Sequence, residues 1–413
     1  MAESRPTRFV GLDVHKFYLV AVGVNAERQQ VYGPQRVLLN RLDHWMMAQL
    51  TAYDAVVLEM STNTWQLYDE LLPHVQSVTV VHPPHLALIT RAQVMNDQIA
   101  ALTLARLHAA GLIPPLWVPP PAVREARALI AQRAKLVRLS TQSKNRLHAV
   151  LQRHHLQPPD GALFAAEQQP WWLSLELLAS ERACIQIDLN TLSFAQAQLK
   201  VLEQALAKTA SDDPRVPLLV QLPGFSLITA LSVLAAIGEI ERFPSAEKLV
   251  GYAGLGARVH ESGLTHHRGR ITKAGRRDLR VALVEAAQTA ANTHPHWQAV
   301  LARLEPRLGR NKAIVAIARK LLVAVWHVLT KQSADRFADS ERVARKFVQF
   351  SARLGKANRP EGQTTAQYVR AQLDRLGLGS ELNSIQLGRQ TTLRLPPPQA
   401  ASTAPERLSG ETK

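Results

Sequence analysis

One stretch of the sequence, from residue 124 to residue 155, contains neither glycine nor proline. It reads REARALIAQRAKLVRLSTQSKNRLHAVLQRHH, and leucines recur along it at Leu129, Leu136, Leu139, Leu147 and Leu151. This pattern predicts a single helix of about thirty residues. A second helical run, from about Leu175 to Thr209, follows the proline-rich break QPPDG. Together the two runs predict an antiparallel helical hairpin, a coiled-coil arm that we place at residues 116–212.

The residues before this arm alternate between strand and helix patterns. The strand-like runs are FVGLDV, FYLVAVGV, a short segment near Gln30 to Tyr32, AVVLEM and VTVVH. Helical stretches lie near Arg41 to Leu50 and Trp65 to Leu72, and another helix begins at Asp97. Such alternation is typical of an α/β domain with a mixed sheet, which we expect at residues 1–115.

The residues after the arm are mainly helical. Residues 213–332 show helical patterning that is interrupted by PGF, by FPS and by the glycine-rich stretch GYAGLGARVHESG. Residues 333–413 predict one or two further helices, followed after Arg394 by a tail rich in Pro, Ala, Ser and Thr that we expect to be disordered.

Charge and cysteine content narrow the class of protein. The 413 residues carry a formal net charge of +16, which favours a polyanionic partner, above all a nucleic acid. The single cysteine, Cys184, excludes an intrachain disulfide framework and fits a reducing cytoplasm. We find no signal-peptide core in MAESRPTRF and expect no run of the roughly twenty apolar residues needed to cross a bilayer. The sequence therefore predicts a protein that is neither inserted into a membrane nor exported.

Three acidic residues of the α/β region stand at positions suited to metal binding. Asp13 lies in an apolar strand, Glu59 ends the strand AVVLE, and Asp97 opens a helix. Strand ends and a nearby helix start converge at one edge of such a sheet, so the three carboxylates are candidates to share Mg²⁺ or Mn²⁺. The alternative is that each acid is a helix cap, a solvated strand end or a salt-bridge partner.

Two further segments suggest contact with nucleic acid. In LVQLPGFSLITALSVLAAIGEIERF, Pro223 and Gly224 set a tight turn between helices, a helix-hairpin-helix-like arrangement whose second helix can face a phosphate; an ordinary helical hairpin is the alternative. A basic stretch follows, ahead of a small-residue helix at residues 278–291, and a solvated charged face is its alternative interpretation. The candidate phosphate contacts are Arg258, Arg268, Arg270, Lys273, Arg276, Arg277, Arg280 and, in the long helix, Lys144 and Arg146.

These motifs together resemble one family. Asp13 in GLDVHK, Glu59 in VVLEMS and Asp97 in NDQIAALTLARL are similar, in order and spacing, to the RuvC-like catalytic domain of the DEDD insertion-sequence transposases. That family comprises bridge-RNA-guided recombinases and includes the Piv-like DNA invertases. The resemblance covers about residues 8 to 330. It implies a RuvC/RNase H-like α/β domain, a coiled-coil arm and a mainly α transposase domain.

The resemblance also exposes one departure. The family usually carries two metal-binding acids three residues apart on the helix, whereas here Asp97 is followed by Ala100 at the second position. With Asp13 and Glu59, the site has three carboxylates instead of four. Either the chain binds metal more weakly, or another group completes the set of ligands, or the chain is disabled.

By the same resemblance, Ser262 in ESG aligns with the serine that family members use as a nucleophile on DNA. We expect His260, His266 and His267 to be phosphate contacts or surface residues, since their spacing matches no common zinc site. The implied protein cuts and rejoins DNA through a serine–DNA intermediate, pairs a structured guide RNA with donor and target DNA, and acts as a dimer or tetramer in a prokaryotic nucleoid. The alternatives are a catalytically disabled RNA- and DNA-binding protein and a structure-selective junction nuclease.

Overall fold

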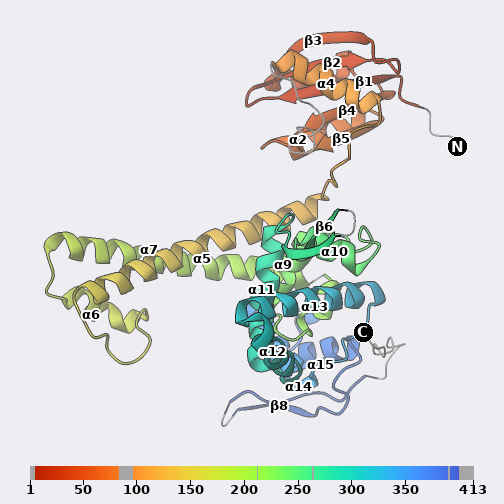
Figure 1. The fold of residues 1–413 in the computed structure, drawn as a ribbon. Coiled ribbons are helices and arrows are strands. Elements are labelled where there is room, and N and C mark those ends of the chain that lie inside the picture. Colours follow the sequence, from red (N-terminus) through yellow and green to blue (C-terminus); the bar gives the residue numbers. More distant parts are fainter. Residues whose placement is uncertain (1–4, 83–95, 212, 263–264, 389–390, 400–413) are drawn as a thin grey trace. The chain divides into compact units, whose positions relative to one another are not determined.

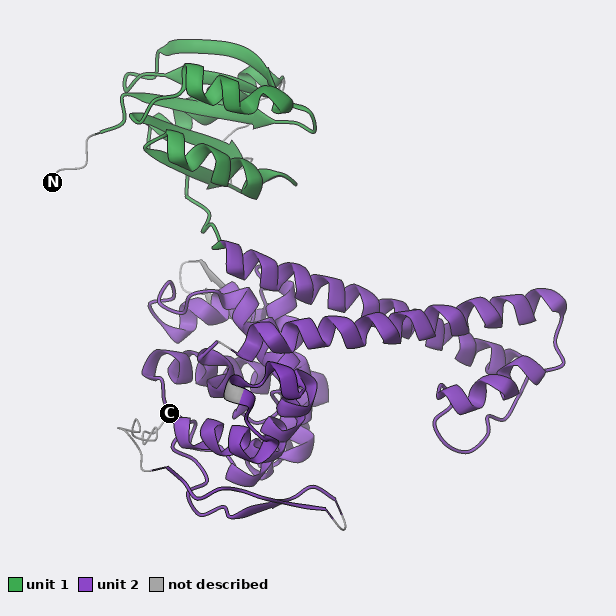
Figure 2. Cartoon of the chain, turned by 180° about the vertical axis from the view of Figure 1, so that it is seen from behind, with its two compact units in different colours: residues 1–120 green, residues 121–413 purple. Residues whose placement is uncertain are grey.

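The computed structural model describes residues 5–82, 96–211, 213–262, 265–388 and 391–399. Side chains within residues 259–268 fall outside this description. The chain divides into two compact units, Met1–Pro120 and Pro121–Lys413 (Figure 2). Each unit is described by itself.

Unit 1 is built on a five-stranded sheet with the strand order β3-β2-β1-β4-β5. Strands β1, β2 and β3 pair antiparallel, whereas β1 pairs parallel with β4 and β4 parallel with β5, so the predicted mixed sheet is confirmed. The bounds of the strands are β1 Arg8–Val14, β2 Tyr18–Val24, β3 Gln30–Leu38, β4 Asp54–Glu59 and β5 Ser77–Val81.

Strand β3 is much longer than the predicted segment near Gln30 to Tyr32. The dipeptide Gly33-Pro34 resembles a turn in the sequence, and most β3 residues are exposed, which removes the apolar signal of a strand. β3 lies at the edge of the sheet, where a proline is tolerated because its missing N–H is not needed for pairing.

Helices cover both faces of this sheet. α1 (Leu42–Gln49) and α2 (Thr64–Leu71) pack through buried residues such as Trp45 and Leu67 on the face that holds Val10 and Leu12. α4 (Asp97–Ala109) lies on the opposite face, with Ala101 against Val20 and Val22 of β2, and Leu104 against Val57 of β4. The three helices are where the sequence predicts them.

The helix α4 approaches β1 very closely at Gly11. A Cβ atom at Gly11 would lie 2.1 Å from the carbonyl oxygen of Ala101 and 2.7 Å from the backbone nitrogen of Ala105. Only a residue without a side chain permits this contact. Gly11 therefore fixes how closely α4 packs against β1.

Unit 2 begins with the predicted arm. α5 (Pro121–Arg153) and α7 (Ala179–Ser211) are 33 residues each and lie side by side, linked by α6 (Gln169–Ser174) (Figure 1). Near α6, Leu147 and Leu151 of α5, Trp172 of α6 and Ile185 of α7 form a separate small core. Arg133 pairs with Glu203 at 2.8 Å across the two long helices.

The rest of unit 2 is mainly helical and shares one large core. Its early elements are α8 (Arg215–Val220), α9 (Leu227–Ile237), α10 (Ala246–Tyr252), β6 (Ala257–Ser262), β7 (Thr265–Ile271) and α11 (Arg277–Thr293). The antiparallel pair β6–β7 was not expected. Its sequence, rich in Gly, His and Arg, lacks the alternation of apolar and polar residues by which a strand is recognised.

The prediction that no apolar run is long enough to span a membrane is wrong for α13 (Arg310–Lys331). An 18-residue window of this helix has a mean hydropathy of 1.7, and half of that window is buried. Ala318, Leu321, Leu322 and Val325 are fully buried in the core of unit 2. Burial inside the domain, with α11 and α12 (Pro295–Leu308) as neighbours, is typical of a core helix.

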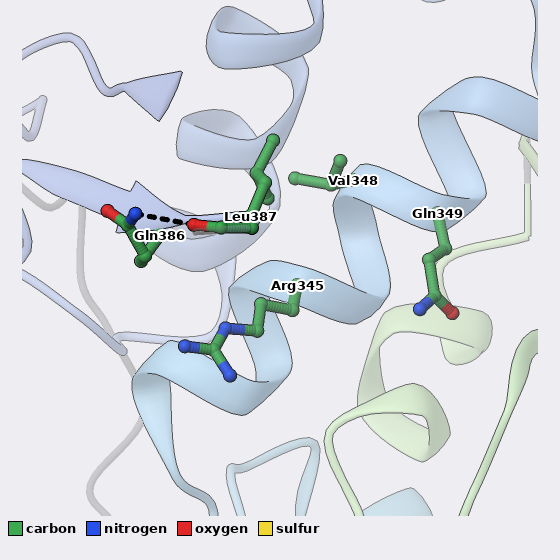
Figure 3. Close-up of a pocket in the computed structure, with 6 residues that line it drawn as sticks. Arg345, Val348, Gln349, Gln386 and Leu387 are labelled. Atoms are coloured by element: carbon green, nitrogen blue, oxygen red, sulfur yellow. Dashed lines mark hydrogen bonds between the residues drawn. The ribbon is translucent and has the colours of Figure 1, made fainter. Parts of the chain in front are cut away.

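The C-terminal elements of unit 2 are α14 (Ser340–Leu354), α15 (Thr365–Arg375) and the short antiparallel pair β8 (Ser384–Gln386) and β9 (Thr392–Arg394). Between α14 and the end of β8 lies an open pocket of about 410 Å³, lined by Arg345, Val348, Gln349, Gln386, Leu387 and Gly388 (Figure 3). The tail expected to be disordered lies, from residue 400 onward, outside the described residues.

Replacing Gly11 by alanine tests the close contact of α4 and β1. The new methyl group would force α4 away from the sheet, and such overpacking costs about 1–3 kcal/mol of unfolding free energy. Gly256→Ala is the control, because a Cβ there meets no atom within 4 Å. Urea unfolding should show a lower free energy of unfolding for Gly11→Ala and little change for Gly256→Ala. Equal free energies of unfolding for the two variants would contradict the packing described.

Candidate metal centre and nucleic-acid surface

Three carboxylates from separate elements of unit 1 lie on one face of the sheet. Side chains alternate along a strand, so Asp13 shares the α4-covered face with Gly11, and Glu59 shares it with Val57. Asp97 is the first residue of α4, and the side chain of Asn96 accepts the backbone N–H of Ile99 at 2.8 Å. This cap fixes where the helix begins and therefore where Asp97 lies.

The tightest group among these side chains is Asp13, His15 and Asp97. One ligand atom from each lies within 4.8 Å of those of the other two. His15 Nε2 is 3.4 Å from Oδ2 of Asp13 and 3.3 Å from Oδ2 of Asp97. Glu59 does not belong to this group of atoms, although it is near enough to Asp13 for the two charges to interact.

The electrostatics of the cluster suit a cation. Burial raises the pKa of Asp13, and the charge of Asp97 raises it further, while His15 opposes the shift. Burial also raises the pKa of Glu59, with a second contribution from Asp13. Crowded, half-buried carboxylates are unfavourable when ionised unless a positive charge lies between them. In addition, Nε2 of His15 is shielded from solvent and makes no hydrogen bond. Oxygen and imidazole donors together fit a divalent metal ion.

Reasoning from sequence missed His15 and its neighbours. The hydroxyl of Tyr18 donates to Oδ2 of Asp97 at 2.9 Å, and the Tyr18 ring stacks on His15 with centroids 4.7 Å apart. The guanidinium of Arg36 lies 3.8 Å from the centroid of the Tyr18 ring. In the sequence, His15 follows Asp13 by two residues. This spacing indicates that the two side chains lie together only if a tight turn is assumed after β1.

The predicted basic surface separates into two kinds of residue. Arg276 pairs with Asp278, its Nε 2.9 Å from Oδ1, and Arg280 donates to the carbonyl of Ala253 at 2.9 Å, so both hold the fold of unit 2 together. Exposed side chains for which the described part of the chain shows no ion pair with an acid are those of Arg258, Arg270, Lys273 and Arg277. The side chain of Arg268 lies outside the described residues.

The candidate nucleophile Ser262 is the last residue of β6. Its backbone pairs with Thr265 of β7, and His260 pairs with His267 in the same ladder. The side chains of Ser262, His260, His266 and His267 are outside the described set, so their predicted roles stay predictions.

Gly224 has a packing role in the turn between α8 and α9. Its φ is +80°, and a Cβ there would lie 2.1 Å from the carbonyl oxygen of Ala286 in α11. Lys346 stabilises the same turn, because its Nζ donates hydrogen bonds to the carbonyls of Val220 and Leu222 at 2.8 Å each. Burial lowers the pKa of Lys346 to about 8. The predicted contact of this turn with a phosphate stays a prediction.

Lys144 and Arg146 have partners within the arm. The ammonium of Lys144 lies 5.4 Å from the centroid of the Phe164 ring. Nε of Arg146 lies 2.9 and 3.0 Å from the two oxygens of Asp188 on α7. Arg146 thus joins α5 to α7, and a contact of either residue with nucleic acid stays a prediction.

The fold and the acidic cluster of unit 1 define a class. A mixed five-stranded sheet, with carboxylates from two strand ends and a covering helix brought together on one face, is the arrangement of an RNase H-like domain. Sequence comparison agrees: residues 10–156 match the DEDD transposase family of the IS110 type, and residues 216–302 match the family described as "Transposase IS116/IS110/IS902 family". Two segments of the chain are thus similar to transposase families of the IS110 type, one of them a DEDD N-terminal domain.

Individual relatives agree with the family match. The chain is 30% identical over 223 residues to the transposase for insertion sequence element IS1111A of Coxiella burnetii, an alignment that covers 52% of this chain and 60% of that protein. It is 37% identical over 119 residues to the pilin gene-inverting protein of Moraxella bovis, covering 28% and 37%. A protein of insertion element IS110 in Streptomyces coelicolor is 26% identical over 141 residues, covering 34% and 35%. The alignments with these relatives thus span less than two thirds of each relative's length.

Neutralising Asp13 tests whether the cluster is a metal centre. In EDTA, Asp13→Asn should leave the protein as stable as before or raise its unfolding free energy by up to about 1 kcal/mol, because one repelling charge is removed from a partly exposed site. Added Mn²⁺ should stabilise the original protein and not the variant. Thermal unfolding with and without Mn²⁺ gives both results, with Asp43→Asn on the exposed face of α1 as the control. Equal stabilisation of all three proteins by Mn²⁺ would exclude a metal site at Asp13.

Proposed function

We propose that this protein is a DNA recombinase of an insertion sequence, which cuts and rejoins DNA through a covalent bond between Ser262 and DNA. A divalent ion held by Asp13, Glu59 and Asp97 would assist the reaction. The observation that supports this most is the cluster of Asp13 and Asp97, with Glu59 near Asp13, on the α4-covered face of an RNase H-like sheet within the region matched by the DEDD transposase family.

The carboxylates would hold Mg²⁺ or Mn²⁺, and the ion would supply positive charge to a reacting phosphate. The chain's own residues prepare this centre. The capped start of α4 and the hydroxyl of Tyr18 orient Asp97. Arg36, exposed and stacked on Tyr18, offers a guanidinium beside the cluster to which a phosphate oxygen can bind.

The covalent step belongs to the β6–β7 hairpin. The Ser262 hydroxyl would lose its proton to a base, its oxygen would bond to the phosphorus, and a deoxyribose oxygen would leave and take up a proton. Family resemblance implies that the serine and the metal centre of one active site come from different subunits.

The exposed cations near the hairpin support a nucleic-acid partner. Arg258 lies on β6, Arg270 on β7, Lys273 in the turn after β7 and Arg277 at the start of α11, and the described residues show no ion pair of these side chains with an acid. We propose that donor and target DNA and a structured guide RNA bind here through their phosphates, in a bacterial nucleoid.

The arm offers a surface for the proposed dimer or tetramer. Ile187, Phe194 and Val201 follow each other at intervals of seven residues along α7, and their side chains are 63%, 57% and 62% exposed. An apolar stripe with a seven-residue repeat on a long helix suits a second helix of the same kind. We propose that a second copy of the chain covers this stripe.

Two other functions would use the same scaffold. A disabled RNA- and DNA-binding protein follows if the absence of an acid at Ala100 abolishes metal binding. A junction nuclease follows if the carboxylates act without Ser262. Metal-dependent strand cleavage separates the recombinase from the binding protein, and a covalent protein–DNA adduct separates it from the nuclease.

The nucleophile is tested by Ser262→Ala. The variant should lose the covalent adduct with element-end DNA while its affinities for RNA and DNA stay within about threefold, because it loses a hydroxyl and no charge. Thr265→Ala, across the β6–β7 ladder, is the matched control and should keep the adduct. Denaturing electrophoresis of labelled DNA detects the adduct. An undiminished adduct in Ser262→Ala would assign the nucleophile elsewhere.

The basic surface is tested through salt dependence. Replacing Arg270, Lys273 and Arg277 together by alanine should weaken binding to any DNA or RNA and reduce the slope of log affinity against log salt by about 2–3, since each lost duplex phosphate contact accounts for about 0.9. Lys312→Ala, exposed on α13, is a single-charge control for a distant surface cation. Fluorescence anisotropy at several salt concentrations measures the slope, and an unchanged slope in the triple variant would place the binding surface elsewhere.

A further inference from the structure

We propose that His15 is a direct metal ligand, which takes the coordination place left by the missing acid at Ala100 and makes the centre selective for Mn²⁺ over Mg²⁺. This inference rests on the proposed function, because it concerns the same centre. The inference is based on the position of the His15 imidazole nitrogen, which lies between the carboxylates of Asp13 and Asp97.

The state of the His15 ring is the first observation. Its Nε2 lies 3.4 Å and 3.3 Å from two carboxylate oxygens, is shielded from solvent and makes no hydrogen bond. Both contacts are longer than an ordinary hydrogen bond, so the nitrogen lies between two carboxylates without a hydrogen bond of normal length to either. A cation bound by the two carboxylates would also lie within reach of the nitrogen lone pair and satisfy it.

The local backbone is the second observation, because it holds the ring in this place. The N–H of His15 donates to the carbonyl of Tyr18 at 2.9 Å and closes the tight turn between β1 and β2. The ring then stacks on Tyr18 with an angle of 27° between the planes, while the Tyr18 hydroxyl binds Asp97. One tyrosine therefore orients both the histidine and the aspartate, which is how ligands of a metal site are preorganised.

The composition of the ligand set is the third observation. Ala100 lies one turn after Asp97 on α4 and has no group that can bind a metal. Replacing a carboxylate by a neutral imidazole removes one negative charge and one oxygen donor. Mg²⁺ strongly prefers oxygen ligands, whereas Mn²⁺ also accepts imidazole nitrogen and binds more tightly than Mg²⁺ to mixed sites. The selectivity for Mn²⁺ follows from this exchange.

The test measures bound Mn²⁺ directly in the full chain. Electron spin-echo envelope modulation of Mn²⁺ on the original protein should show coupling to an imidazole nitrogen. His15→Gln should lose that coupling and bind Mn²⁺ at least about tenfold more weakly, while His44→Gln, an exposed histidine of α1, should match the original protein. Circular dichroism confirms that each variant is folded. Competition should show that the original protein binds Mn²⁺ at least about tenfold more tightly than Mg²⁺.

A reciprocal variant sharpens the result. His15→Gln combined with Ala100→Asp returns a carboxylate one helical turn after Asp97 and should restore tight binding, with the preference moved toward Mg²⁺. Mn²⁺ bound without nitrogen coupling in the original protein, or coupling that survives in His15→Gln, would overturn the role of His15 and leave the proposed function standing. A protein that binds no Mn²⁺ and no Mg²⁺ would overturn both.

Discussion

The contact between α4 and β1 at Gly11 is the constraint on which the candidate centre depends. Because Gly11 has no side chain, the carbonyl of Ala101 lies where a Cβ would otherwise be. Asp13 follows Gly11 by two residues on the same face of the strand, and Asp97 precedes Ala101 by about one turn of the helix. The separation between the two carboxylates is therefore set by this close backbone approach, and a looser contact would move the ligands apart.

Fewer basic side chains are available to bind phosphate than the net charge of the chain suggests. Arg146, Arg276 and Arg280 were candidates for contact with phosphate, yet Arg146 joins the two helices of the arm, Arg276 pairs with Asp278, and Arg280 binds a backbone carbonyl. Breaking such contacts to bind a phosphate would leave a carboxylate or a carbonyl without its partner. The described residues show no such contact for Arg270 in the hairpin, for Lys273 just after it or for Arg277 at the start of α11.

Much of the fold could be predicted because its signals are local. The long arm helices follow from the absence of Gly and Pro, and the sheet strands β1, β2, β4 and β5 follow from apolar runs. Strand β3 was predicted only in part, because most of its residues are exposed, and β6 was missed because its sequence lacks the alternation of apolar and polar residues. That Asp13 and Asp97 lie close together was expected from their places on a strand and at a helix start, whereas the nearness of His15 was missed because it depends on a turn and on stacking with Tyr18. The packing of Gly224 against Ala286 joins residues too far apart in sequence to be foreseen.

The two ends of the β1–β4 strand pair show why the carboxylates at one end point to function. At the first end, Asp54 is almost completely buried, but Arg8 donates to both of its oxygens at 2.8 and 2.6 Å, and the N–H of Thr51 donates at 2.7 Å. That carboxylate is fully compensated from within unit 1. At the other end, burial raises the pKa of both Asp13 and Glu59, and His15, whose Nε2 lies 3.4 Å from Oδ2 of Asp13, only opposes the shift at Asp13. The same two strands thus carry one carboxylate that stabilises the fold, Asp54, and a pair, Asp13 and Glu59, that lowers stability until a cation binds. Carboxylates that lower stability in this way are expected where their charge serves chemistry and not folding.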